Sequence, residues 1–219
     1  MAQRLTRRGP LSRQEIVLRA LEVAEAEGVE KLSLHKVASA AGVRTMSLYN
    51  HIRDKDDVLD AMADTILRRV GIGETDALEW SDALRELAFA FREAALEFPK
   101  SAPLVLTRRM NAPAGLPLVE AALRVLRRAG LEPPAAVHVL RSFIAFLIGT
   151  LSREVGTAPS YAAVIPEVTT SRAADLASSG FPAVAAAAAE LSVCDHEAEM
   201  RFGLDLLIEG VRRRTEPAA

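Results

Sequence analysis

The sequence is poor in cysteine, histidine and aromatic residues. Cys194 is the single cysteine among 219 residues, which excludes an internal disulfide and a cysteine-rich metal cluster. The four histidines are scattered, with no helical pair beside a carboxylate. The sequence also contains no nucleophile elbow, phosphate-binding loop or dinucleotide fingerprint. We therefore expect no enzyme, no resident cofactor and no metal site.

Long hydrophobic runs are absent as well. The segment after Met1 is polar and rich in arginine, unlike a secretory signal. The longest apolar run, residues 142–151, lies between Arg141 and Arg153. It is much shorter than the roughly 20 residues that a membrane-spanning helix needs. We expect a cytoplasmic protein without a membrane partner.

The charges are unevenly distributed along a chain whose net charge is only −2. Residues 1–70 hold 12 Lys and Arg against 10 Asp and Glu, whereas residues 71–219 hold 15 against 19. The first 19 residues carry five arginines, Arg13 among them, and one acid, Glu15. A basic end favours contact with DNA, although a tail that only keeps the chain soluble would look the same.

Helical periodicity dominates, and half of the residues are hydrophobic, so the sequence predicts an all-α fold with a real core. Ser12, Ser33 and Asp54 are expected to cap helices, and Glu15 to reach back toward Ser12. Residues 157–181 are expected to form a loop with one helical turn, either a pocket gate or a linker. The patterns predict helices over residues 13–28, 34–41, 45–51, 55–70, 80–98, 104–110, 117–129, 135–155, 182–191 and 196–213.

Residues 33–59 have the pattern of a helix-turn-helix followed by a third helix. Ala38, Gly42 and Leu48 place a small residue, a turn residue and an apolar anchor at the spacing of two closely crossing helices. The second helix carries short or hydrogen-bonding side chains, which suit a surface that approaches base edges and phosphates.

This stretch resembles the tetracycline-repressor (TetR) family of bacterial transcription regulators. The resemblance is strongest over residues 12–70, in S-L-H-K-V-A-S-A-A-G-V and S-L-Y-N-H-I-R-D-K-D-D-V-L, with a weaker match at 202–211. It implies a DNA-binding domain at 1–56 with a basic tail at 1–11, a connecting helix and junction at 57–78, and a ligand-binding and dimerisation domain at 79–219. The DNA-contacting residues that motif and resemblance together predict are Ser33, His35, Arg44, Thr45, Met46, Ser47, Tyr49, Asn50, His51 and Lys55.

The resemblance also implies a pocket for a small molecule in the C-terminal domain. Leu87 stands where the tetracycline repressor has an asparagine, so magnesium-bound tetracycline fits poorly and an apolar or aromatic ligand is expected. For each single candidate, plain core packing is the commoner interpretation. The pocket candidates are Phe91, Met110, His138, Arg141, Phe143 and Phe146.

Helices 135–155 and 196–213 are more apolar than one domain requires, and the first is expected to be buried on several sides. In the family, two such helices pair with their symmetry mates, so we expect a homodimer that reads a palindromic operator. The predicted dimer residues are Leu147, Gly149, Leu151, Gly203, Leu204, Leu207, Ile208 and Val211.

Together the helix-turn-helix pattern and the family resemblance imply a ligand-responsive repressor of double-stranded DNA. Two alternatives remain open at this point. One is a DNA-binding activator or nucleoid-associated factor without an inducer. The other is a small helical enzyme or partner-binding module.

Overall fold

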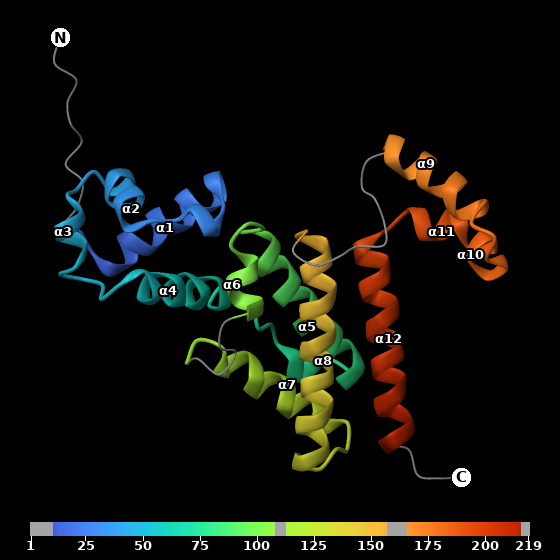
Figure 1. The fold of residues 1–219 in the computed structure, drawn as a ribbon. Coiled ribbons are helices and arrows are strands. Elements are labelled where there is room, and N and C mark those ends of the chain that lie inside the picture. Colours follow the sequence, from blue (N-terminus) through green and yellow to red (C-terminus); the bar gives the residue numbers. More distant parts are fainter. Residues whose placement is uncertain (1–10, 108–112, 157–165, 216–219) are drawn as a thin grey trace. The chain divides into compact units, whose positions relative to one another are not determined.

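The computed structural model describes residues 11–107, 113–156 and 166–215, and every regular element in these ranges is a helix (Figure 1). The all-α prediction is therefore confirmed. The chain divides into two compact units, Met1–Gly71 with Glu93–Pro117, and Ile72–Arg92 with Leu118–Ala219. The division predicted from the sequence, at 1–56, 57–78 and 79–219, stays a prediction.

The first unit is built around a small core between short helices. In it α1 packs against α2 and α4, α2 against α3, and α4 against α6. Burying each large side chain of this core contributes about 1.5–3 kcal/mol relative to leaving it in water. The helices are α1 (Arg13–Glu27), α2 (Leu34–Ala41), α3 (Thr45–Leu48), α4 (Lys55–Leu67) and α6 (Ala102–Thr107), with a 3-10 turn at Val29–Lys31. Their fully buried side chains include Ile16, Leu21, Val37, Leu48, Val58, Met62 and Ile66.

The three predicted caps of this unit are confirmed. The Ser12 hydroxyl accepts from the backbone N–H of Glu15, and the Asp54 carboxylate from that of Asp57. The Ser33 hydroxyl accepts a hydrogen bond in the first turn of α2 in the same way. The Glu15 carboxylate was expected to bond back toward Ser12. It pairs instead with Arg19, one turn further along α1, at 2.7 Å.

The second unit has its core between α5, α7, α8 and α12. Arg92 on α5 pairs with Glu154 on α8 at 2.5 Å, and α8 lies beside α12 (Figure 1). The helices are α5 (Trp80–Leu96), which runs on into the first unit, α7 (Leu116–Arg128), α8 (Pro133–Glu154) and α12 (His196–Thr215), with a 3-10 turn at Thr75–Ala77. Core members include Leu84, Leu87, Val125, Leu126, Phe143, Met200, Leu204, Ile208 and Val211.

Two sequence-based expectations about residues 157–192 were wrong. Instead of one helical turn, α9 runs for three turns over Pro166–Ala177. The single alanine-rich helix expected at 182–191 is broken at Ala187 into α10 (Pro182–Ala186) and α11 (Ala188–Ser192). Because α9 packs against both α10 and α11, tertiary packing overrode the weak local propensities of this segment. The described part of the segment is thus three short helices that pack on one another.

The expectation that α8 is buried on several sides was also wrong for the single chain. By length and composition α8 could cross a membrane, yet only 22% of its apolar window is buried. Phe143 faces the core, whereas Ala145 and Gly149 are exposed. One apolar face of α8 is therefore not covered by the chain itself.

Candidate DNA interface

The turn between α2 and α3 has the geometry that its sequence predicts. Gly42 has φ +70° and ψ 31°, the left-handed conformation that costs a residue with a Cβ atom more than it costs glycine. Its N–H donates to the Ser39 carbonyl, and the N–H of Val43 donates to that of Ala38, both at 3.0 Å. These bonds close the end of α2 and direct the chain into α3.

Helix α3 is a single turn that is anchored on one side and exposed on the other. Leu48 is fully buried and fastens it to the unit's core. Met46 is 75% exposed and Tyr49 is 48% exposed. Arg44 and Asn50 are exposed beside them. The outward face thus offers a cation, an amide, a phenol and a thioether, groups that can contact base edges and phosphates.

The start of α4 lies directly after α3 in the chain and adds a second feature suited to phosphate. Asp54 caps the helix, and Lys55 is its first residue. The N-terminus of this 13-residue helix carries a partial positive charge and free N–H groups, which favour an anion. Lys55 is half-buried and His51, four residues before it, is half-buried too.

Two of the predicted DNA-contacting residues, Ser33 and His35, lie at the start of α2. The Ser33 hydroxyl is occupied as an acceptor by the first turn of α2, so its capping role is already accounted for. His35 is exposed on the same helix. Thr45 and Ser47 are half-buried on α3. Ser33 precedes α2 as its cap and Arg44 lies in the turn between α2 and α3, whereas the other eight residues lie on α2, on α3 or in the segment from α3 to the start of α4. The contacts of all ten with DNA stay a prediction.

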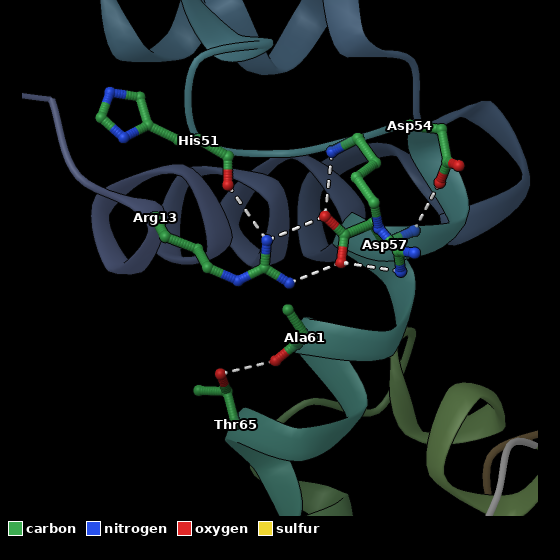
Figure 2. A network of polar contacts seen from close by, with 7 residues as sticks. Arg13, His51, Asp54, Asp57, Ala61 and Thr65 are labelled. Carbon is green, nitrogen blue, oxygen red and sulfur yellow. Dashed lines mark hydrogen bonds and ion pairs between the residues drawn. The ribbon is translucent and has the colours of Figure 1, made fainter.

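A polar network behind this surface was not anticipated from the sequence. Arg13 on α1 donates two hydrogen bonds to the Asp57 carboxylate, from Nη1 to Oδ2 at 2.8 Å and from Nη2 to Oδ1 at 2.6 Å (Figure 2). The same Nη1 donates to the carbonyl of His51 at 3.1 Å. The backbone N–H of Arg53 also donates to Asp57, at 3.0 Å. The network joins α1, the α3–α4 segment and α4.

This network determines the protonation of Asp57. The hydrogen bonds from Arg13 hold the pKa of the buried carboxyl well below its usual range, against the opposing effect of burial. The sequence contains one signal of this network. Asp57 stands three residues after the cap Asp54, where an acid often bonds back to the cap's own N–H, but it reaches Arg53 and Arg13 instead.

The five described pocket candidates lie on α5 and α8 of the second unit, and they differ in burial. Phe91 is 2% exposed and Phe143 is nearly as buried, so both belong to the packed interior. His138 and Arg141 are exposed on α8. Met110 lies outside the described residues. A groove of about 630 Å³ between α8 and α12 is lined by ten residues, among them His138, Phe143 and Leu206.

The predicted dimer residues divide into two groups. Leu151, Leu204, Ile208 and Val211 are buried within the chain itself. Gly149 is exposed, and Leu147, Gly203 and Leu207 are half-buried. Phe202 and Leu206, which are not among the predicted dimer residues, are 68% and 61% exposed. Their i,i+4 spacing puts them on one face of α12, a signal that was available in the sequence.

Gly203 allows a close approach of α8 to α12. A Cβ atom at this position would overlap the ring of Phe146, whereas a Cβ at Gly210, two turns further along α12, would meet nothing. Gly203, which was predicted as a dimer residue, therefore packs against α8 of its own chain.

Comparisons with known proteins agree with this architecture. Residues 16–62 match the family model described as bacterial regulatory proteins of the tetR family, and residues 73–215 match that of the tetracyclin repressor-like C-terminal domain. A tetracycline repressor protein of class G from Vibrio anguillarum is 28% identical over 209 residues, 93% of this chain and 94% of that protein. A transcriptional regulator of the HTH type from Saccharopolyspora erythraea is 29% identical over 144 residues, 66% of this chain.

The match to the Saccharopolyspora erythraea regulator spans 61% of the length of that protein. Among solved structures, the TetR family protein ActR of Streptomyces coelicolor in complex with actinorhodin has a TM-score of 0.85 at 23% identity, covering 97% of this chain and 100% of that one. This likeness shows the fold. The C-terminal family model alone covers well over half of the residues. The chain therefore belongs to the TetR family, whose members are transcriptional regulators and not enzymes.

Proposed function

We propose that this protein is a DNA-binding transcriptional repressor that reads a palindromic operator as a homodimer and is released by a small apolar or aromatic molecule. The observation that carries the proposal is the outward face of α3, where Met46 and Tyr49 are exposed on a capped helix-turn-helix. In this arrangement phosphate contacts from Tyr49, His51 and Lys55 position the protein, and contacts from residues 44–47 read the bases.

The dimer is supported by the uncovered apolar face of the second unit. Phe202 and Leu206 on α12 lie exposed, and α8 leaves Ala145 and Gly149 open. A second copy of the chain would cover this face. The dimer would then carry two DNA-binding heads, each formed by α1 to α4, about 34–36 Å apart, which is one turn of DNA. We propose that this face of α8 meets a second copy and not lipid, in a cytoplasmic protein.

Release by a ligand is supported by what similar proteins bind. The ActR structure contains actinorhodin, and the Vibrio protein is named a tetracycline repressor. In this chain Leu87 is buried in the core of the second unit, so this position offers an apolar side chain and no amide for a metal-bound ligand. A ligand that binds the DNA-free state more tightly would shift the protein away from its operator.

The first test is binding of the purified protein to its own upstream DNA, against a scrambled duplex of equal length at one fixed salt concentration. A preference of about a thousandfold or more identifies an operator reader. Equal binding to both duplexes would contradict specific reading of that DNA. Binding to many scattered sites with no releasing compound would instead identify a nucleoid-associated factor.

The contact surface is tested by Tyr49→Ala. We expect operator affinity to fall by about tenfold or more, because the variant removes one of the phosphate contacts that position the protein. Phe181→Ala is the matched control, since Phe181 is an equally prominent aromatic residue, 68% exposed, in the other unit. Undiminished operator affinity of Tyr49→Ala would contradict the assignment.

A further inference from the structure

The Asp57 carboxylate is a buried anion with three hydrogen bonds. Its side chain is 9% exposed, and it accepts two bonds from Arg13 and one from the backbone N–H of Arg53. The Arg53 guanidinium lies 3.7 Å away as a further counter-charge. A carboxylate held this way has little freedom to turn, so it fixes the position of whatever is bonded to it.

Arg13 connects three parts of the head through one guanidinium. It is the first residue of α1, and it reaches Asp57 in the first turn of α4 and the carbonyl of His51, just after α3 (Figure 2). The segment from His51 to Arg53 is thereby bonded at both ends. This segment leads from the exposed face of α3 to the helix N-terminus at Lys55.

The geometry points to Arg13 and Asp57 as positioning residues for operator reading, an inference that rests on the proposed function. Arg13 belongs to the basic N-terminal segment, for which the sequence suggested direct contact with DNA. Its two terminal nitrogens are instead committed to Asp57 and His51. Arg13 thus acts on DNA through the α3–α4 segment, by holding Tyr49 and Lys55 in register with each other.

The charge of Asp57 allows a positioning role to be separated from simple electrostatic repulsion of DNA. Asp57 is negative and lies in the first turn of the helix whose N-terminus is expected to face phosphate. If only charge mattered, Asp57→Asn would tighten DNA binding, because it removes a repulsion from the phosphates. If Asp57 positions the reading surface, the same substitution weakens specific binding.

The experiment compares Asp57→Asn with Asp56→Asn, which makes the same charge change at an exposed residue of the same turn. We expect Asp57→Asn to lose about tenfold or more of operator affinity, with affinity for a scrambled duplex unchanged or higher. Asp56→Asn should keep or improve both. Operator binding by Asp57→Asn that equals or exceeds wild type would overturn the inference.

Salt dependence separates positioning from phosphate contact. Log affinity falls as log salt concentration rises, and losing one phosphate contact makes this slope less steep by about 0.9. We expect this change for Lys55→Gln. Arg13→Gln should weaken operator binding while leaving this slope unchanged. The double variant Arg13→Gln with Asp57→Asn should be no weaker than the worse single variant, since both break one unit. A lowered slope for Arg13→Gln together with additive losses would show that Arg13 contacts DNA directly.

A measurement without DNA tests the positioning role of Arg13 and Asp57 separately from the proposed operator binding. Hydrogen exchange of the Arg53 amide reports its bond to Asp57, and it should accelerate in Arg13→Lys, which keeps the charge but cannot make the paired bonds. Arg13→Lys also serves if an uncharged variant fails to fold. Unchanged exchange and unchanged operator binding in Arg13→Lys would overturn the inference. Wild-type protein that shows no operator preference would contradict the proposed function, whatever the amide does.

Discussion

At the scale of single residues, Asp57 couples the stability of the DNA-binding head to pH. Because Arg13 lowers its pKa, the folded head holds this proton less tightly than the unfolded chain, whose Asp titrates near pH 4. The stability from this carboxylate is therefore present above about pH 4 and lost as the pH falls toward the pKa of the folded state.

We predict that Asp57→Asn lowers the free energy of unfolding of the head by about 1–3 kcal/mol at pH 7, and that this difference shrinks on acidification to pH 3. Hydrogen exchange of buried amides in α1 and α4 measures this energy at each pH. Asp56→Asn is the control at an exposed position. A difference between Asp57→Asn and wild type that stays constant from pH 7 to 3 would contradict the prediction.

Cys194 is the second residue whose titration can be tested. Burial, followed by the hydrogen bond from its Sγ to Glu199, raises the pKa of the thiol to about 11. Because the thiolate is the reactive form, we predict that iodoacetamide modifies Cys194 about a hundredfold more slowly at pH 8 than an ordinary thiol. Glu199→Gln should accelerate the reaction. A rate that already levels off near pH 9 would show that the thiol is not held in this way.

At the scale of helices, Gly203 determines how closely α8 approaches α12. We predict that Gly203→Ala destabilises the protein by about 1–2 kcal/mol, because the new methyl group forces the Phe146 ring to move. Gly210→Ala is the control on the same helix, where the methyl group meets nothing and better helix propensity adds up to about 1 kcal/mol. Thermal unfolding of both variants measures the contrast, and equal shifts would contradict it.

Most helices of this protein were predictable because their signals are local. Ser12, Ser33 and Asp54 each bond an N–H three residues away, a distance that a sequence pattern can represent. The break at Ala187 and the length of α9 were not predictable, because they depend on packing between α9 and α11. Alanine-rich sequence favours a helix in general but does not say where one ends.

At the scale of the whole molecule, the exposed stripe on α12 predicts how the protein assembles. We expect Phe202→Glu with Leu206→Glu to weaken the proposed dimer by a hundredfold or more, about 3 kcal/mol, because each substitution places a charge at an apolar contact. Sedimentation equilibrium measures the dissociation constant. Leu116→Glu, at a residue 53% exposed on α7, should leave it unchanged. A double variant that stays dimeric would place the interface elsewhere.

The amino-acid sequence by itself determined the class of fold, the helix caps and the turn at Gly42, because these follow from neighbouring residues and backbone sterics. It also identified the exposed face of α3, since Leu48 marks the opposite side. Tertiary structure decided the rest. Arg13 meets Asp57 across 44 positions, and Phe146 meets Gly203 only where α8 lies beside α12. Such contacts depend on how helices pack, a property that periodicity along one helix does not contain.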